Sequence, residues 1–432
     1  MPDAQHASSI PLQHFTLANG LRVYLREDHR APLVDAQLWY HVGSSYEPEG
    51  HSGLSHALEH LMFEGSRKLA PGEYARLMTR LGGQPNAFTQ KDATVFPLTL
   101  PAKHLEIALE AMADCMASAT LDQAPFAREL AVIMAERSER IDNSPLALAW
   151  EKHTQLAYGK SAYATPEIGH HSDLLQMTNA AVRTWYRTWY HPNNATLAVA
   201  GAIDVRQLRL LVERHFGAIP QNRLPDVKRP RMDATSLQRS QTLQHKGQRD
   251  GLLMSYEVPS LATADSPEQA HALNLLRYLL AVGNSSRMRR LMLDETQMAL
   301  AMGSDYSMVR RGDRLLSFLA YSNPEKAKPE QLKDRLLAEV ERCRHTPVDA
   351  AELARAKAKV LSQRVFEQDD IAMRAGQIGQ YASAGLDPTL LDHEHQAIEN
   401  VTAEQIRQAA HDYLTHDRLT VTYMLGKESN HA

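Results

Sequence analysis

Residues 53–63 read Gly-Leu-Ser-His-Ala-Leu-Glu-His-Leu-Met-Phe. Its apolar residues recur with the period of a helix, so we predict a helix over residues 53–65. His56, Glu59 and His60 lie on one side of that helix, because each residue advances the helix by ~100°. Two imidazoles and a carboxylate therefore share one face of a helix suited to burial, where unpaired polar groups are costly.

This combination of side chains predicts a metal site. Imidazole nitrogens bind zinc, and a carboxylate beside the metal can act as a general base by taking a proton from bound water. The H-x-x-E-H order of His56 to His60 is the inverse of the commoner H-E-x-x-H arrangement. The motif alone is moderately specific, and two satisfied histidines on a helix are the alternative interpretation.

Zinc needs a third protein ligand, while a catalytic site keeps the fourth position for water. The segment Pro125–Arg140 is predicted to be a helix, and it carries Glu129, Glu136 and Glu139. Glu129 and Glu136 are seven residues apart and share a face, so spacing does not choose between them. Acidic residues on the solvated face of an amphipathic helix are the alternative.

The rest of the chain alternates between strand and helix patterns. A hairpin turning at Asn19-Gly20, a turn pair suited to positive φ at both positions, opens the chain. The stretch Pro220–Pro230 is rich in proline and charge without an apolar period, which is typical of a linker. We therefore predict an α+β protein with helices packed on mainly antiparallel sheets, divided into an N-terminal domain (10–216), a linker (217–248) and a C-terminal domain (249–428) without a metal site.

The two halves show a weak internal similarity. His56-Ala57-Leu58 aligns with His271-Ala272-Leu273 at an offset of 215 residues, and in both places a helix is predicted to follow a strand. If the chain is duplicated, the second copy has lost the acid and the second histidine. Only the first half can then hold a metal.

The composition narrows the class of protein. The 432 residues are 43% apolar and 23% charged, with a net charge of -4, so the chain has no basic excess for a nucleic-acid partner. No apolar run reaches the ~18 residues of a membrane span, and we expect a soluble protein. Cys115 and Cys343 are interpreted as buried apolar side chains. Met1–Ser9 lacks the apolar core of a signal peptide, but a removed signal would leave the same start, so both the cytoplasm and the periplasm of a bacterium stay open.

Several motifs together resemble the pitrilysin/insulinase family of inverted-motif zinc peptidases, and in particular its short bacterial members related to the mitochondrial processing peptidase. The similarity covers nearly the whole chain and is densest from Leu12 to Asp204. The motifs are Gly53–Phe63, Gly-Gly-Gln-Pro-Asn-Ala-Phe-Thr at 82–89, the pair Glu129 and Glu136, and Tyr-His-Pro-Asn-Asn-Ala-Thr at 190–196.

The resemblance implies roles that spacing leaves open. Glu136 matches the third zinc ligand of the family, and Glu129 matches an acid just outside the ligand set. Asn86, Ala87 and Phe88 match an edge strand to which a substrate peptide adds in extended form. Such strand addition gives affinity with little demand on sequence, and Gly82-Gly83 would let the chain turn into the edge. The family fold has two similar α+β domains facing each other across a cavity.

The C-terminal half departs from the family pattern. Active single-chain members of the short class carry an arginine and a tyrosine after a Ser-Arg-Leu helix start, which is present here as Ser285–Met288. In this alignment the two positions are Leu293 and Leu300, while Arg289, Arg290 and Tyr306 are out of register. Heterodimeric relatives divide the zinc motif and the arginine–tyrosine pair between subunits. The resemblance thus implies a heterodimer with a homologous subunit that carries the pair, with a homodimer as the form without that partner.

Together these observations predict the catalytic subunit of a zinc metalloendopeptidase that acts on extended peptides, with Glu59 activating the water. The alternative is a non-catalytic scaffold subunit of a larger complex that retains the zinc motif.

Overall fold

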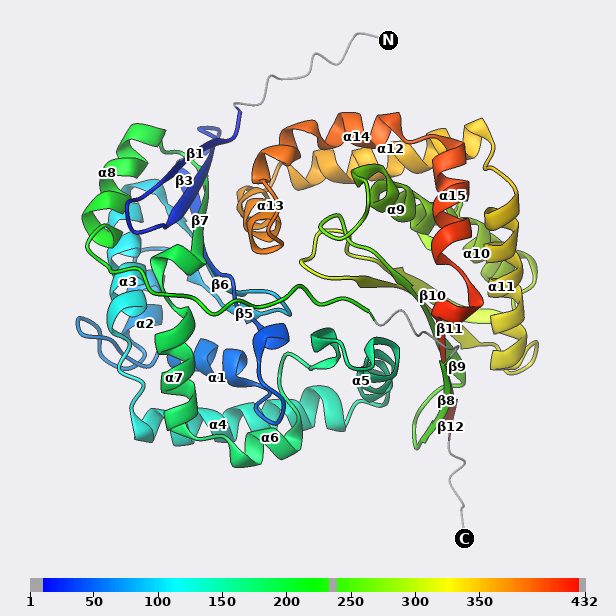
Figure 1. The fold of residues 1–432 in the computed structure, drawn as a ribbon, viewed down its shortest axis with the longest axis horizontal. Helices are drawn as coiled ribbons and strands as arrows, with labels where there is room; N and C mark the ends of the chain where they lie inside the picture. Colours follow the sequence, from blue (N-terminus) through cyan, green and yellow to red (C-terminus); the bar gives the residue numbers. More distant parts are fainter. Residues whose placement is uncertain (1–10, 233–238, 427–432) are drawn as a thin grey trace. The chain divides into compact units, whose positions relative to one another are not determined.

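A computed structural model describes residues 11–232 and 239–426, and in it the chain forms two compact units (Figure 1). Each unit is an α+β structure in which helices pack on a mixed sheet. The first unit comprises Met1–Ile133, Pro166–Val227 and Phe366–His393, and the second comprises Met134–Thr165, Lys228–Val365 and Glu394–Ala432. The Met1–Ser9 segment and residues 233–238 of the predicted linker lie outside the described residues.

The sheet of the first unit has the strand order β1-β2-β7-β3-β6-β4, and β5 also pairs with β6. The β2–β7 pair is parallel and the other pairs are antiparallel. Its strands are β1 (Gln13–Thr16), β2 (Arg22–Glu27), β3 (Leu33–Tyr40), β4 (Gln84–Pro85), β5 (Phe88–Thr89), β6 (Thr94–Pro101) and β7 (Ala195–Gly201).

The opening hairpin is confirmed, with one difference at its turn. β1 and β2 pair antiparallel around Asn19-Gly20, and Gly20 has φ = 86°. Within the described ranges Asn19 is not among the residues with positive φ. Its buried side chain instead donates to the carbonyls of Phe216 and Ile219, at 2.8 and 2.9 Å, so a tertiary contact sets its conformation.

The sheet of the second unit has the order β10-β11-β9-β12-β8. Its strands are β8 (Arg239–His245), β9 (Gly251–Val258), β10 (Ala299–Asp305), β11 (Arg314–Ser322) and β12 (Leu419–Gly426). β8 lies inside the predicted linker 217–248, so that part of the segment belongs to the second sheet rather than to a connection.

The two sheets repeat one pairing scheme. In the first, β2 is parallel to β7, and β7, β3 and β6 follow antiparallel. In the second, β8 is parallel to β12, and β12, β9 and β11 follow antiparallel. This shared topology supports the duplication that the offset between His56 and His271 indicates.

Both helices predicted by range are present, although the first covers only residues 54–61 of the predicted 53–65. The helix α4 (Gln123–Arg137) begins in the first unit and ends in the second. It is followed by a π-helical turn at Ser138–Asp142. The other helices of the first unit are α1 (Leu54–Leu61), α2 (Glu73–Arg80), α3 (Leu105–Ser118), α6 (His171–Gln176), α7 (Asn179–Trp189) and α8 (Val205–Phe216). Those of the second are α9 (Pro267–Ala281), α10 (Arg287–Arg289), α11 (Pro329–His345), α12 (Ala350–Glu367), α14 (Glu394–Asn400) and α15 (Ala403–Tyr413).

Each unit also takes one helix from the other half of the sequence. α13 (Ile371–Ser383) packs on β2, β3 and β7 of the first sheet, and α5 (Pro145–Tyr158) packs on β8, β9 and β12 of the second (Figure 1). The strands covered are equivalent in the two sheets. The compact units therefore differ from the contiguous ranges 10–216 and 249–428.

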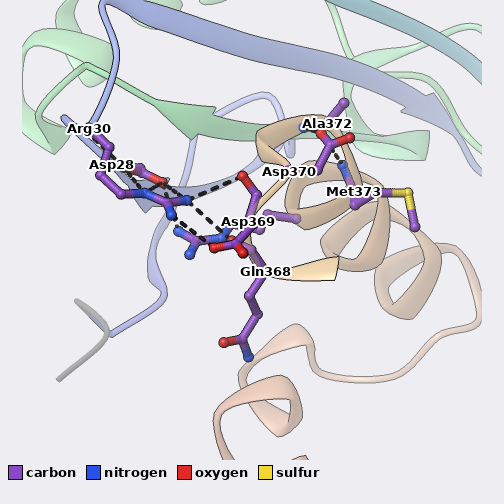
Figure 2. A network of polar contacts seen from close by, with 8 residues as sticks. Asp28, Arg30, Gln368, Asp369, Asp370, Ala372 and Met373 are labelled. Atoms are coloured by element: carbon purple, nitrogen blue, oxygen red, sulfur yellow. Dashed lines mark hydrogen bonds and ion pairs between the residues drawn. The ribbon is translucent and has the colours of Figure 1, made fainter. Parts of the chain in front are cut away.

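α13 is fixed to the first unit by polar contacts and close packing. Figure 2 shows the polar contacts near its first turn, where Arg30 bonds both Asp28, at 2.8 Å, and Asp369, at 3.0 Å. The charge-assisted bond from Arg30 lowers the pKa of Asp28. Further along α13, a Cβ at Gly379 would lie 2.1 Å from the ring of Trp39, so only glycine allows this approach.

The cysteines agree with expectation. Cys115 and Cys343 are buried free thiols, and burial raises the pKa of each. Within the described ranges, no helix combines the length and apolarity that a membrane crossing requires.

Candidate metal centre

The start of α1 is held by a loop and by the neighbouring helices α6 and α7. Gly53 precedes the helix with φ = 92°, and a Cβ there would lie 2.9 Å from the side chain of Leu174. The partly buried Glu47 accepts hydrogen bonds through its carboxylate from the backbone N–H groups of Gly53 and Ser55, both at 2.7 Å. Ser55 in turn accepts a bond from the indole N–H of Trp185 at 3.2 Å. An acid at a helix N-terminus is favourable because it satisfies N–H groups that have no partner within the helix.

α1 and α4 bring three candidate ligands together. The rings of His56 and His60 lie edge to face with centroids 4.7 Å apart. One ligand atom from each of His56, His60 and Glu136 lies within 4.8 Å of the others, and all three residues are partly buried. Glu136 is in the last turn of α4, an unbroken helix that begins in the first unit. Within the described ranges, no other group of this kind is present.

The donor set fits zinc. Zinc–nitrogen and zinc–oxygen bonds of about 2.0–2.2 Å place two ligands of a tetrahedral ion roughly 3.4 Å apart. Donors within 4.8 Å reach that spacing by small side-chain rotations. Glu136 also pairs with Arg140 one turn further on, at 2.6 Å, and Arg140 is exposed.

Glu129 lies beside the candidate ligands and is held from both sides. Its Oε2 is 3.2 Å from Nδ1 of His60, and its Oε1 accepts from Nε of Arg128 at 3.1 Å. Arg128 is anchored by a second carboxylate, that of Glu64. A carboxylate on Nδ1 fixes the orientation of the ring and directs Nε2 outward as a ligand atom.

Glu59 lies in the middle of α1 and is only 8% exposed. Its Oε2 accepts a hydrogen bond of 2.6 Å from Oγ1 of Thr89, which is on β5. No sequence spacing signals this contact, because Thr89 reaches the helix from a strand. The contacts of Glu47 with the start of α1 are likewise not signalled by sequence spacing, because Glu47 lies in a loop.

The predicted substrate strand lies at an edge of the first sheet. Asn86 and Ala87 connect the short strands β4 and β5, and Phe88 is the first residue of β5. The Asn86 side chain is exposed and accepts from the backbone N–H of Ala87 at 2.9 Å. Phe88 packs edge to face on Trp39, with ring centroids 6.1 Å apart. Phe88 is therefore part of the core as well as of the edge.

Leu293 and Leu300, which stand at the positions of the arginine–tyrosine pair of the family, lie in the second unit. Leu293 is partly buried in a π-helical turn, and Leu300 is 54% exposed on β10, an edge strand of the second sheet. The neighbouring polar groups are engaged elsewhere: the buried Tyr306 hydroxyl donates to the carbonyl of Pro259 at 2.8 Å, and Arg290 pairs with Glu295 at 3.0 Å.

A duplicated α+β scaffold with this inverted motif in its first copy defines a class of zinc peptidase. The profile of Insulinase (Peptidase family M16) matches residues 22–166, and that of the Peptidase M16 inactive domain matches residues 176–360. The two profiles together cover most of the chain, which belongs to the M16 (insulinase) family of peptidases.

Its relatives include zinc proteases. The zinc protease PqqE of Helicobacter pylori is 27% identical over 433 residues, covering 98% of this chain and 95% of that protein. The mitochondrial-processing peptidase subunit beta of Bos taurus is 29% identical over 215 residues, or 50% of this chain and 44% of that protein. A protease from Helicobacter pylori has a crystal structure that matches with a TM-score of 0.89 at 25% identity, over 96% of this chain and 100% of that one.

Proposed function

We propose that this chain is the catalytic subunit of a zinc metalloendopeptidase that cleaves extended peptides. The observation that carries the proposal is the convergence of His56, His60 and Glu136 within 4.8 Å, with Glu59 on the same helix as the two histidines. The arrangement of two similar halves across a cavity, which the family resemblance implies, is part of this proposal.

The residues have distinct roles in the proposed reaction. His56, His60 and Glu136 would hold the ion, and Glu129 would orient His60. A zinc ion bound there polarises the scissile carbonyl and lowers the pKa of water. Glu59 takes the proton of the attacking water and returns it to the leaving amine.

The substrate would bind as an additional strand at the β4–β5 edge. Main-chain hydrogen bonds to an edge strand tolerate many side chains, so this mode suits an endopeptidase of broad sequence preference. Asn86, Ala87 and Phe88 would supply the contacts. The partial exposure of Ala87 and Phe88 and the position of β5 on the outer side of β6 support this assignment.

We further propose a homologous partner subunit that lacks H-x-x-E-H and carries the arginine and tyrosine. The side chains of Leu293 and Leu300 have no donors for a substrate main chain, and the Tyr306 hydroxyl donates to Pro259. Groups that hold a peptide near the metal can supply several kcal/mol of the barrier. The partner would provide them.

The test combines zinc content with hydrolysis of a quenched fluorescent peptide, measured on the chain alone and with the partner. We expect close to one zinc per chain and slow cleavage that the partner accelerates. Glu59→Gln should remove cleavage and keep zinc, while Glu139→Gln, an exposed acid nearby, serves as the control. Zinc binding without cleavage in any combination would favour the scaffold alternative.

A further inference from the structure

Thr89 links the proposed base to the edge of the first sheet. Its hydroxyl donates to Oε2 of Glu59 at 2.6 Å. β5 packs against α1, so the bond joins two elements that are already in contact. We propose that Thr89 is a positioning residue that orients Glu59 for catalysis, an inference that rests on the proposed function.

The chemistry of the carboxylate explains why a second group is needed. The terminal torsion of a glutamate side chain is broad, so each contact on the Glu59 carboxylate narrows the orientations that it samples. The Thr89 hydroxyl binds Oε2 and thereby restricts rotation of the carboxylate. A general base must lie within ~2.6–3.2 Å of the proton it takes, and a displacement of about 1 Å can cost ~100-fold in rate.

Strand pairing and backbone hydrogen bonds of the neighbouring residues hold Thr89 in place. It pairs with Thr94 across the β5–β6 ladder, and the next residue, Gln90, donates its N–H to the carbonyl of Ala93 at 2.8 Å. The carbonyl of Gln90 accepts from the N–H of Ser44 at 3.1 Å. A Cβ at Gly43 would lie 2.1 Å from that same carbonyl oxygen, so this close approach of the two backbones requires glycine.

The position of Thr89 also gives the bond a role in substrate recognition. β5 lies at the edge where a peptide strand would add, and Thr89 directly follows Phe88 there. Pairing of a peptide with β5 would order the same backbone that carries Thr89. Strand addition and alignment of Glu59 are therefore mechanically coupled, and a peptide that pairs poorly should be cleaved slowly even when it binds.

The competing interpretation is that Thr89 only satisfies a buried carboxylate and serves stability. The two are separated with Thr89→Val, which keeps the shape and removes the donor, and Thr89→Ser, which restores the donor. Thr79→Val, at an exposed threonine of α2, is the matched control. Each variant is made in the native background and with Glu59→Gln, loaded with zinc and assayed with the partner and, over longer times, alone.

For Thr89→Val we expect kcat to fall by ~10–100-fold with KM within about 3-fold, because the transition state needs the base aligned and binding does not. Thr89→Ser should recover to within about 3-fold of the native rate. Zinc content should stay unchanged. In the Glu59→Gln background Thr89→Val should have little further effect, since residues acting as a unit are non-additive.

A readout independent of turnover comes from crystal structures of the zinc-loaded variants. Glu59 should occupy one conformer in the native and Thr89→Ser proteins and several in Thr89→Val. A native rate for Thr89→Val, an equal loss in the Glu59→Gln background, or a single Glu59 conformer in Thr89→Val would each overturn the inference. An active Glu59→Gln enzyme would instead overturn the proposed base itself.

Discussion

The two acids of α4 make a sharp test of the metal centre. Glu129 and Glu136 are seven residues apart, which is about 10.5 Å along a helix, so only one of them can be a ligand of a given ion. Glu136 lies within 4.8 Å of the histidine donors, and Glu129 contacts Nδ1 of His60. We expect Glu136→Gln to weaken zinc binding far more than Glu129→Gln.

The size of the smaller effect follows from the contacts of Glu129. Its loss removes one hydrogen bond to a ligand imidazole, and a bond to a charged group contributes about 1.5–3 kcal/mol. This corresponds to roughly 10–100-fold in affinity, the range found for groups that orient a metal ligand. Glu136→Gln replaces an anionic ligand by a neutral amide, and the loss should exceed ~100-fold.

Competition with a chromophoric chelator at pH 7.5, supported by elemental analysis, gives both affinities on one scale. Glu139→Gln is the matched control, because it removes an exposed acid just beyond the same helix. Circular dichroism checks that each variant is folded. If Glu129→Gln lost zinc while Glu136→Gln retained it, the ligand assignment would be reversed.

Four further outcomes are expected. Glu59→Gln should keep zinc and lose ~10²–10⁴-fold in hydrolysis, measured by peptide cleavage beside metal content, and an unimpaired variant would refute the base. The partner subunit should raise cleavage at least ten-fold, a gain cancelled by mutating its arginine or tyrosine; full activity of this chain as a monomer would contradict this. Burial between Ser255 and Thr422 lowers the pKa of His153 to about 3, so the unfolded state alone takes up a proton as pH falls below ~6.5. The stability that this neutral imidazole contributes is therefore complete above pH ~6.5 and is lost toward pH 3, at up to ~1.4 kcal/mol per pH unit. In urea unfolding, the difference in stability between the native protein and His153→Gln should shrink between pH 7.5 and pH 5. A constant difference would contradict this expectation. Gly379→Ala should lower the unfolding temperature of the first unit, because its Cβ would lie 2.1 Å from the Trp39 ring, and a neutral change would show that α13 can shift.

The predictions that are confirmed rest mainly on patterns among residues that are close in the sequence. The helix with His56, Glu59 and His60 is confirmed because its spacing is a property of neighbouring residues, and α4 follows for the same reason. The choice between Glu129 and Glu136 needed the family resemblance, since a heptad places both on one face.

Contacts between distant segments could not be predicted in this way. The Thr89–Glu59 bond depends on a strand that returns to the helix after 30 residues. The exchange of α5 and α13 between the units depends on packing such as that of Gly379 on Trp39, 340 residues apart. Neither periodicity nor composition carries information on such pairings.

The second copy explains why the duplicated fold has a single candidate metal centre in the described residues. His271 on α9 stands where His56 stands on α1, but Asn274 and Leu275 replace the acid and the second histidine. All three are buried, and burial lowers the pKa of His271 to about 4, which keeps the imidazole neutral in the core. A histidine without an acid and a second histidine at the next turn of the helix lacks the ligand count to bind zinc. The helix that presents a polar face in the first copy is a core helix in the second, and the candidate metal ligands of the described residues lie on α1 and α4.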